Sequence, residues 1–132
     1  MSMPITIDES YSVYKTVLLM FEKDIGTIFI TKDGNLAGIV SRKDLLRIAI
    51  GKRDIEQIPI NLIMTRMPNI ICGTTEDSAY ALAKKIIEHE IDSIPIVEKV
   101  NNEILGKGEL KIVGKISKTN ITKLFVKLGE GN

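Results

Sequence analysis

Two short motifs in the chain place a carboxyl or amide side chain three residues after a serine. The first pairs Ser41 with Asp44, and the second pairs Ser117 with Asn120. Each serine follows a predicted strand with a glycine near its end, and each is expected to begin a helix. A helix start offers unpaired amide N–H groups and a positive dipole end to an anion. A serine hydroxyl there can bind a phosphate oxygen, and the two oxygens of an aspartate can accept hydrogen bonds from a vicinal diol.

The motif also has a purely structural interpretation. Ser-x-x-Asp at a helix start is close to a capping box, in which the two side chains satisfy backbone amides. One isolated instance would favour the cap. Recurrence at the same place in two parts of the chain favours a functional role for Ser41 and Asp44, and leaves both interpretations open for Ser117 and Asn120. An uncharged amide offers one acceptor oxygen, so a second site is expected to bind more weakly or to take a different ligand.

The other reactive residue types do not form a catalytic or metal site. His89 stands between Glu88 and Glu90 without a nearby nucleophile, and we expect it to be solvated. Cys72 lacks both a histidine partner and a second cysteine, which excludes a thiol nucleophile or a zinc site built around it. The Gly-Lys-Gly sequence at 106–108 lacks the frame of a P-loop. We therefore predict that the protein is not an enzyme and that it has no metal site.

An internal repeat positions the two motifs. Residues 12–30 match residues 78–96 at a constant spacing of 66, and residues 38–45 match residues 114–121 at a spacing of 76. The extra residues of the second copy fall in a polar stretch at 99–109, where the first copy has a short turn. Because loops accept insertions at little cost, a hairpin whose loop grew in one copy explains both spacings.

Each copy predicts a strand, a helix, a strand, a hairpin turn, a strand and a second helix. The apolar periodicity, the β-rich runs and the Asp33-Gly34 turn signal support this order. In the first copy, the elements after the first strand are expected at 13–21, 27–31, 33–34 and 36–40, followed by a helix from Ser41 onward. In the second copy, they are expected at 79–87, 93–97 and 110–116, followed by a helix from Ser117 onward. Between the copies, Pro59 and Pro68 act as breakers, and a short helical turn is expected at 61–64.

The composition is that of one compact domain. Of 132 residues, 44% are hydrophobic, and 18 basic residues against 17 acidic ones give a formal net charge of +1. Such a balance does not draw the whole chain to nucleic acid or to a membrane, so any anion site must be local. The longest apolar runs are too short to span a bilayer, and neither a leader nor an internal disulfide is expected. We therefore expect a cytoplasmic protein without a membrane segment.

The motif Gly-apolar-apolar-Ser-x-x-Asp, at the end of such a repeat, resembles the nucleotide-contact motif of CBS domains. Three further sequences resemble the same family: Ile-Pro-Ile-Val at 94–97, Ile-Phe-Ile at 28–30 and Ile-Met-Thr at 63–65. The resemblance extends from Pro4 to about Leu128. It implies an α+β fold of two β-α-β-β-α CBS repeats that pack as a pseudo-twofold pair, called a Bateman module. The repeats would cover 4–51 and 68–128, with an inter-repeat linker at 52–67.

A longer match covers the runs 40–47, 63–69 and 118–125. These runs are similar to the C-terminal sensor half of the bacterial catabolite-control repressors of gluconeogenic genes. Those repressors carry a helix-turn-helix domain ahead of their CBS pair, and the chain has no room for one before Pro4. The resemblance therefore implies an isolated sensor domain without direct nucleic-acid contact, which would reach DNA only through a missing helix-turn-helix domain.

The resemblance implies an adenine nucleotide, AMP, ADP or ATP, as a regulatory ligand and not as a catalytic cofactor. In CBS proteins the residue types at Ser41 and Asp44 contact phosphate and ribose, and the same roles extend to Ser117 and Asn120. The adenine slot of such proteins lies near the backbone at 5–7, 70–71 and 95–96.

Five further residues are candidates for the nucleotide site. Thr27 and Ser93 open the central strands, where CBS proteins often place polar or basic groups toward phosphate. Arg42, Lys43 and Lys118 are candidates to supply positive charge, and a solvent-facing helix start is their alternative.

Pro95 has no amide donor. It is therefore expected on an edge strand or beside a ligand.

The resemblance also implies a homodimer, formed through apolar residues left exposed on the helices. Two other functions remain open. One is a dimerisation module whose clefts have lost their ligand, which the uncharged Asn120, Thr27 and Ser93 favour. The other is a regulatory domain of an enzyme or a transporter.

Overall fold

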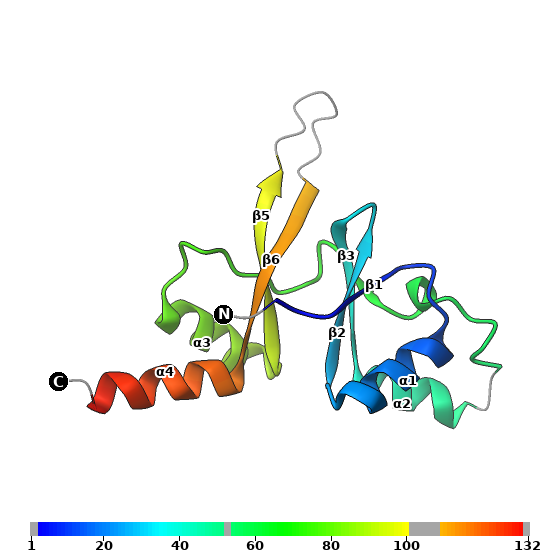
Figure 1. The fold of residues 1–132 in the computed structure, drawn as a ribbon, viewed down its shortest axis with the longest axis horizontal. Coiled ribbons are helices and arrows are strands. Elements are labelled where there is room, and N and C mark those ends of the chain that lie inside the picture. The colour runs from blue at the N-terminus through cyan, green and yellow to red at the C-terminus, as the bar shows by residue number, and fades with distance from the viewer. Residues whose placement is uncertain (1–2, 52–53, 101–108, 131–132) are drawn as a thin grey trace. The chain divides into compact units, whose positions relative to one another are not determined.

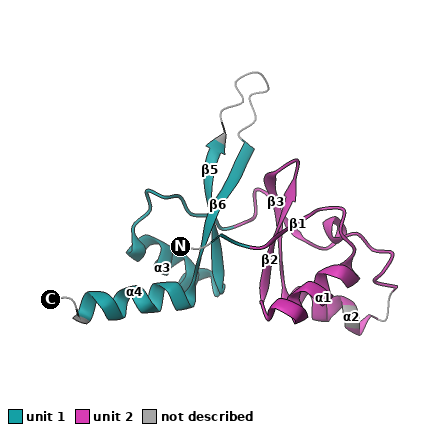
Figure 2. Cartoon of the chain, in the orientation of Figure 1, with its two compact units in different colours: residues 1–4, 71–132 teal, residues 5–70 magenta. Residues whose placement is uncertain are grey.

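The computed structural model describes residues 3–51, 54–100 and 109–130 (Figure 1). The chain divides into two compact units (Figure 2). Residues Ile5–Ile70 form the first-repeat unit, and Met1–Pro4 with Ile71–Asn132 form the second-repeat unit. The α+β fold class is confirmed, since each unit combines two α-helices with a small sheet. Residues 101–108, the centre of the loop that we expected to be enlarged, lie outside the described residues.

The first-repeat unit has a four-stranded sheet in the order β1-β2-β3-β4. β1 pairs parallel with β2, which pairs antiparallel with β3, and β3 pairs antiparallel with the short β4. The elements of this unit are β1 (Thr6–Asp8), α1 (Val13–Lys23), β2 (Thr27–Lys32), β3 (Asn35–Ser41), α2 (Arg42–Ile50), the 3₁₀ helix η1 (Ile60–Leu62) and β4 (Thr65–Arg66).

The predicted hairpin between β2 and β3 is confirmed. Lys32 pairs with Asn35, so the loop holds only Asp33 and Gly34. Both loop residues have positive φ, 52° and 81°. Two adjacent left-handed residues match the twist of an antiparallel pair, and Asp-Gly is a sequence that adopts this conformation easily.

The second-repeat unit has a two-stranded antiparallel sheet, β5-β6. Its elements are α3 (Ala79–His89), β5 (Ser93–Val100), β6 (Glu109–Ser117) and α4 (Lys118–Glu130). In place of the parallel strand β1, the unit has a single parallel bridge between Gly73 and Ile96. The sequence position that Phe29 occupies in β2 is taken here by Pro95, which has no N–H to donate. Because Pro95 cannot donate, the parallel pairing cannot extend from the Gly73–Ile96 bridge past Pro95.

The first helix of each repeat, α1 or α3, is capped in the same way. Ser12 accepts a hydrogen bond from the amide of Lys15 at the start of α1, and Ser78 accepts one from Ala81 at the start of α3. Each helix ends at an acidic residue in the left-handed conformation, Asp24 with φ 49° or Glu90 with φ 52°. These caps satisfy backbone groups that have no partner inside a helix, so the repeated serines set the helix boundaries.

Each unit has its own hydrophobic core. The core of the first-repeat unit joins α1, β2 and β3 to Ile60 and Met64 from the segment after α2. The core of the second-repeat unit packs residues of α3 and β5 against α4. It contains Leu82, Ile86, Ile94, Ile96 and Ile121.

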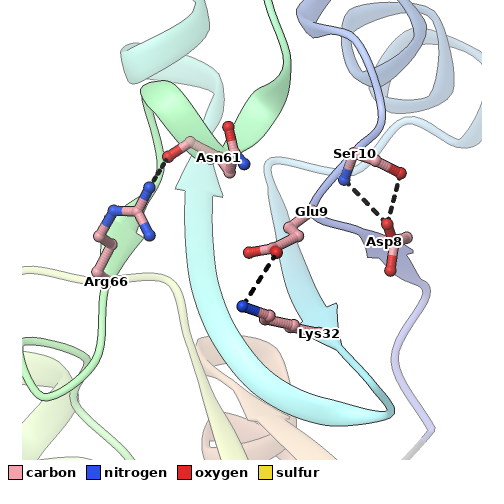
Figure 3. A network of polar contacts seen from close by, with 6 residues as sticks. All are labelled: Asp8, Glu9, Ser10, Lys32, Asn61 and Arg66. Atoms are coloured by element: carbon pink, nitrogen blue, oxygen red, sulfur yellow. Dashed lines mark hydrogen bonds and ion pairs between the residues drawn. The ribbon is translucent and has the colours of Figure 1, made fainter.

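The inter-repeat linker packs onto the first-repeat unit. The amides of Ile60 and Asn61 donate to the carbonyls of Tyr11 and Glu9, and Ile60 is fully buried. The guanidinium of Arg66 donates to the carbonyl of Asn61, and Lys32 lies 3.8 Å from the carboxylate of Glu9 (Figure 3). The helical turn that we expected at 61–64 occurs at Ile60–Leu62, because Pro59 has its φ at −72° and begins the turn.

Two hydrogen bonds between Ser10 and Asp8 stabilise the end of β1. The hydroxyl and the amide of Ser10 both donate to the carboxylate of Asp8 (Figure 3). These hydrogen bonds hold the pKa of the Asp8 carboxyl below its ordinary value.

The described helices are short or carry many charges. Within residues 3–51, 54–100 and 109–130, none is both long and apolar enough to cross a bilayer.

Candidate functional site

The predicted motif residues of the first repeat lie together where β3 meets α2. The amide and the hydroxyl of Ser41 donate to one oxygen of Asp44, Oδ2, at 3.0 and 2.9 Å. The amide of Asp44 donates back to the Ser41 hydroxyl at 3.3 Å. This is the reciprocal arrangement of a capping box, with an aspartate in place of the usual glutamate. The structural interpretation of the motif is therefore present in the molecule.

The second repeat has the same geometry where β6 meets α4. The amide and the hydroxyl of Ser117 donate to Oδ1 of Asn120 at 3.0 and 2.9 Å, and the amide of Asn120 donates to the Ser117 hydroxyl at 3.1 Å. All four motif residues are half-buried. The identical bonding means that the two repeats differ in the chemistry of one side-chain group and not in its placement.

The cap leaves a different group available in each repeat. In Asp44, Oδ2 accepts both hydrogen bonds, and no donor to Oδ1 is found among the described residues. In Asn120, the single oxygen accepts both hydrogen bonds, which leaves the Nδ2 amino group. A carboxylate oxygen accepts hydrogen bonds, whereas an amide NH₂ donates them. The first repeat therefore presents an acceptor at the position where the second repeat presents two donors.

Thr27 and Ser93 lie opposite the motif serines. In the β2–β3 pair Thr27 faces Ser41, and in the β5–β6 pair Ser93 faces Ser117. Thr27 is half-buried, whereas Ser93 is buried with 9% of its surface exposed. Each repeat thus brings two hydroxyls side by side at the end of its hairpin, next to the start of a helix.

The basic candidates have different surroundings. The guanidinium of Arg42 donates to the carbonyl of Ile25 at 3.1 Å and lies 3.6 Å from the carboxylate of Asp24. Lys118 lies 3.2 Å from the carboxylate of Asp92. Lys43 is exposed at the start of α2. The acids beside Arg42 and Lys118 gave no signal in the motif pattern, because they precede the first strand of each hairpin and are brought close only by folding.

Pro95 is fully buried in β5. Its carbonyl accepts a hydrogen bond from the amide of Gly73 at 3.0 Å, and it is paired with Lys115 of β6 on the other side. Beyond the single bridge at Gly73, β5 has no second neighbouring strand among the described residues, so Pro95 lies on an edge strand as its missing amide predicts.

Two apolar grooves occupy equivalent places in the two units. The α1–α2 groove has a volume of about 440 Å³, and the α3–α4 groove about 430 Å³. Phe21 in the first groove and Ile87 in the second are 85% and 74% exposed. The lining residues are Val17, Met20, Phe21, Asp24, Arg42, Leu45 and Leu46, and Ala83, Ile86, Ile87, Glu90, Lys118, Ile121, Thr122 and Phe125.

The remaining reactive residue, Cys72, is half-buried at the start of the second-repeat unit. Burial raises the pKa of the Cys72 thiol, and the nearby Lys85 ammonium lowers it by a smaller amount. A raised thiol pKa leaves little thiolate at neutral pH, which is unfavourable for nucleophilic catalysis. No cluster of three metal-binding side chains occurs in the part of the chain that the structure describes.

Comparison with known proteins identifies relatives over nearly the whole chain. The chain is 42% identical over 130 residues to the transcriptional repressor CcpN of Bacillus subtilis (strain 168), a match that covers 98% of this chain and 58% of the repressor. It is 30% identical over 118 residues to a homoserine O-acetyltransferase of Methanococcus vannielii, covering 89% of this chain and 22% of that protein. The chain thus spans only part of both relatives.

Solved structures share the fold. The CBS domain pair of protein MJ0100, in complex with 5′-methylthioadenosine and S-adenosyl-L-methionine, has a TM-score of 0.76 at 22% identity and covers 100% of this chain and 93% of that chain. The CBS-domain containing protein ATU1752 of Agrobacterium tumefaciens has a TM-score of 0.70 at 19% identity, with 92% and 89% covered. Residues 1–51 also match the family model of the CBS domain. Residues 1–51 therefore match a CBS domain, and the chain as a whole has the fold of a CBS domain pair.

Proposed function

We propose that the chain is a regulatory module that senses an adenine nucleotide, AMP, ADP or ATP, and that it is the ligand-binding part of a bacterial transcriptional repressor. The observation that carries this proposal is the duplicated helix start, where the cap formed by Ser41 and Asp44 leaves one carboxylate oxygen of Asp44 available in the first turn of α2. An acceptor next to an anion-binding helix end suits a ribose joined to a phosphate. The relationship to the CcpN repressor supports the regulatory role.

Within this proposal the site residues have distinct roles. Ser41 and Ser117 bind phosphate with help from Thr27 and Ser93, and Asp44 holds the ribose of its nucleotide. Asn120 is the counterpart of Asp44 in the second repeat.

Two of the three basic candidates must leave their present ion pairs before they can contribute positive charge to the nucleotide site. Arg42 and Lys118 would have to leave Asp24 and Asp92 before they contact a phosphate, whereas Lys43 is exposed and needs no such exchange. Exposed ion pairs of this kind contribute little free energy, so the exchange costs little.

We further propose a homodimer formed through the α1–α2 and α3–α4 grooves. Large apolar side chains such as Phe21 and Ile87 are exposed there, and burying them in a symmetric interface would be favourable. The same observation supports the alternative of a dimerisation module without ligand.

A second alternative is a regulatory domain of an enzyme. The homoserine O-acetyltransferase relative supports it, since 89% of this chain matches 22% of that protein. In either case we propose that the chain itself has no catalytic activity, acts in the cytoplasm, binds no membrane, and reaches DNA only through a helix-turn-helix domain.

Isothermal titration calorimetry with AMP, ADP and ATP tests the sensing function, with GMP as the control for the base. A ligand that binds only the folded state raises the unfolding free energy by RT ln(1 + [L]/Kd), about 2.7 kcal/mol at a concentration of 100 Kd. Thermal melting with the same nucleotides must therefore show a matching stabilisation. If none of the adenine nucleotides binds, the sensing role is wrong, and analytical ultracentrifugation decides whether the dimerisation module remains.

A further inference from the structure

We propose that Asn120 makes the second repeat selective for an adenine nucleotide whose ribose carries a phosphate on its 2′ or 3′ oxygen. This selectivity rests on the proposed nucleotide-binding function and assigns a ligand class to the second of the two motifs. Asn120 is the specificity-determining residue, because it presents hydrogen-bond donors where Asp44 of the first repeat presents an acceptor.

A backbone donor fixes the orientation of the Asn120 side chain. The amide N–H and the hydroxyl of Ser117 donate to Oδ1 of Asn120 at 3.0 and 2.9 Å. A backbone N–H can only donate, so turning the Asn120 amide group over would place two donors against each other. The Nδ2 amino group is therefore held on the side away from the cap, and it has no acceptor among the described residues.

The two helix starts also differ in charge. Asp44 is an acidic residue in the first turn of α2, whereas the first turn of α4, which is fully described, contains no acidic residue. The positive dipole end of α4 is therefore not offset by a carboxylate of its own first turn, and it favours an anion. A phosphate placed against Asp44 would meet a negative oxygen, whereas a phosphate placed against Asn120 would meet an amino group with two donors.

The hydroxyl of Ser93 is a second, independent sign of a ligand at this helix start. Ser93 is only 9% exposed, and its side chain has no hydrogen-bond partner among the described residues. It is paired directly with Ser117, and residues directly opposite in an antiparallel pair have their side chains on the same face of the sheet. The hydroxyl therefore lies beside the start of α4. Because a nearly buried hydroxyl without a partner is costly, its position there indicates a ligand that supplies the partner.

Ser93 and Asn120 together favour a ligand that brings acceptor oxygens. The two hydroxyls of a free ribose diol need an acceptor for their protons, which Asp44 provides and the outward amino group of Asn120 does not. The oxygens of a doubly ionised phosphate monoester only accept, and hydrogen bonds to such a charged group are stronger than those between neutral groups. Phosphorylation of the ribose replaces a hydroxyl donor with these oxygens. The second repeat is therefore suited to the phosphorylated ribose and the first repeat to the free diol.

The probes are adenosine 3′,5′-bisphosphate, AMP with its free diol, and inorganic phosphate. Each is titrated into the intact ¹⁵N-labelled protein and followed by NMR. The side-chain amide signals of Asn120 and the backbone amide of Ser117 report on the second repeat, and the backbone amide of Asp44 reports on the first. We expect the bisphosphate to bind the second repeat about tenfold or more tightly than AMP does, since it gains a hydrogen bond to a charged group. Inorganic phosphate is expected to bind there more weakly than the bisphosphate.

Three protein variants make the test specific. Asn120→Asp is expected to weaken binding of the bisphosphate about tenfold or more and to strengthen binding of AMP, while the cap persists as it does with Asp44. Gln57→Glu makes the same change of amide to carboxylate at an exposed position and must leave both affinities unchanged. Ser93→Ala removes a hydroxyl without a partner among the described residues, so it should weaken bisphosphate binding about fivefold without lowering the Tm.

The outcomes separate the ligand class of the second repeat from nucleotide sensing as such. If AMP binds and the bisphosphate binds the second repeat no more tightly, the selectivity is wrong and sensing stands. If neither nucleotide shifts the signals of Asp44, Ser117 or Asn120, both are wrong. Changes of equal size and direction for AMP and the bisphosphate in Asn120→Asp would remove Asn120 as the selective residue. Binding of inorganic phosphate as tight as that of the bisphosphate would show a simple anion site and would also overturn the assignment.

Discussion

The hydroxyl of Ser41 donates a hydrogen bond to Oδ2 of Asp44 at 2.9 Å and accepts one from the Asp44 amide at 3.3 Å. The pair therefore closes the start of α2 and still leaves Oδ1 of the carboxylate without a donor among the described residues. Capping and ligand binding use different oxygens of one side chain. A variant of Asp44 changes both the helix cap and the ligand contact. The stability of the unliganded protein and its affinity for the nucleotide therefore have to be measured separately.

Replacing Asp44 with Ala is expected to weaken binding of an adenine nucleotide about tenfold or more. A hydrogen bond to a charged group is worth about 1.5 to 3 kcal/mol, and the ribose loses its acceptor. Calorimetry measures the change in Kd. The control is Glu22→Ala, which removes an exposed acid from α1 and must leave the Kd unchanged. Equal affinity of the Asp44 variant and the wild type would remove this residue from the site.

Replacing Asn120 with Asp is expected to strengthen binding in the second repeat for a nucleotide with a free ribose diol. The change replaces the outward amino group with an acceptor oxygen and keeps the cap, since Ser117 can bond either side chain. The gain should be on the order of 1 kcal/mol, about fivefold in affinity. A 2′,3′-dideoxy analogue should gain nothing in the same calorimetric titration. Equal gains for both ligands would show that residue 120 does not contact the ribose.

Replacing Ser41 with Ala is expected to lower the free energy of unfolding of the unliganded protein by about 1 kcal/mol. The variant loses the hydroxyl that accepts from the Asp44 amide, and an N-cap of this kind contributes about that much. Urea denaturation followed by circular dichroism measures the change. Lys43→Ala, at an exposed position of the same turn, serves as the control and should have almost no effect.

Replacing Gly73 with Ala is expected to destabilise the second-repeat unit by about 1 to 3 kcal/mol through overpacking. A Cβ at this position would lie 2.5 Å from Cδ2 of Leu82 and 3.0 Å from Cδ1 of Ile96, which is almost fully buried. Gly26→Ala is the matched control, because its Cβ would meet no atom within 4 Å. Thermal unfolding should show a lower Tm only for the Gly73 variant.

A double variant tests whether contact with Leu82 causes the destabilisation by Gly73→Ala. Leu82→Ala removes the atom closest to the new methyl group, so the double variant should be less destabilised than the sum of the two single changes. Strict additivity would show that the clash with Leu82 is not the cause.

Cys72 is expected to react with iodoacetamide more slowly than an unstructured cysteine between about pH 7 and pH 9, because burial raises its thiol pKa and thiolate is the reactive form. Replacing Lys85 with Met removes a positive charge and should raise this pKa further, which shifts the pH dependence of alkylation to higher pH. Mass spectrometry after timed alkylation gives the rate. A shift to lower pH would show that the Lys85 ammonium does not stabilise the thiolate.

The sequence by itself determined the elements that depend on neighbours along the chain. Asp33-Gly34 predicted the two-residue hairpin, the apolar spacing after Ser12 and Ser78 predicted the first helix of each repeat, and the Ser-x-x-Asp pattern predicted the start of α2. Turn conformations, helical periodicity and caps arise from interactions over one to four residues, so they can be read from the order of residues alone.

Only the tertiary structure decided how these elements find partners far away in the chain. The pairing of Lys118 with Asp92 and the packing of Ile58 and Ile60 beside α1 join segments that are distant in sequence, and no local pattern specifies them. The same holds for the linker after α2, which packs back onto α1 so that the amides of Val13 and Tyr14 donate to the carbonyls of Ile58 and Ile55. Long-range packing of this kind depends on the shape and polarity of complete surfaces, which form only when the chain has folded.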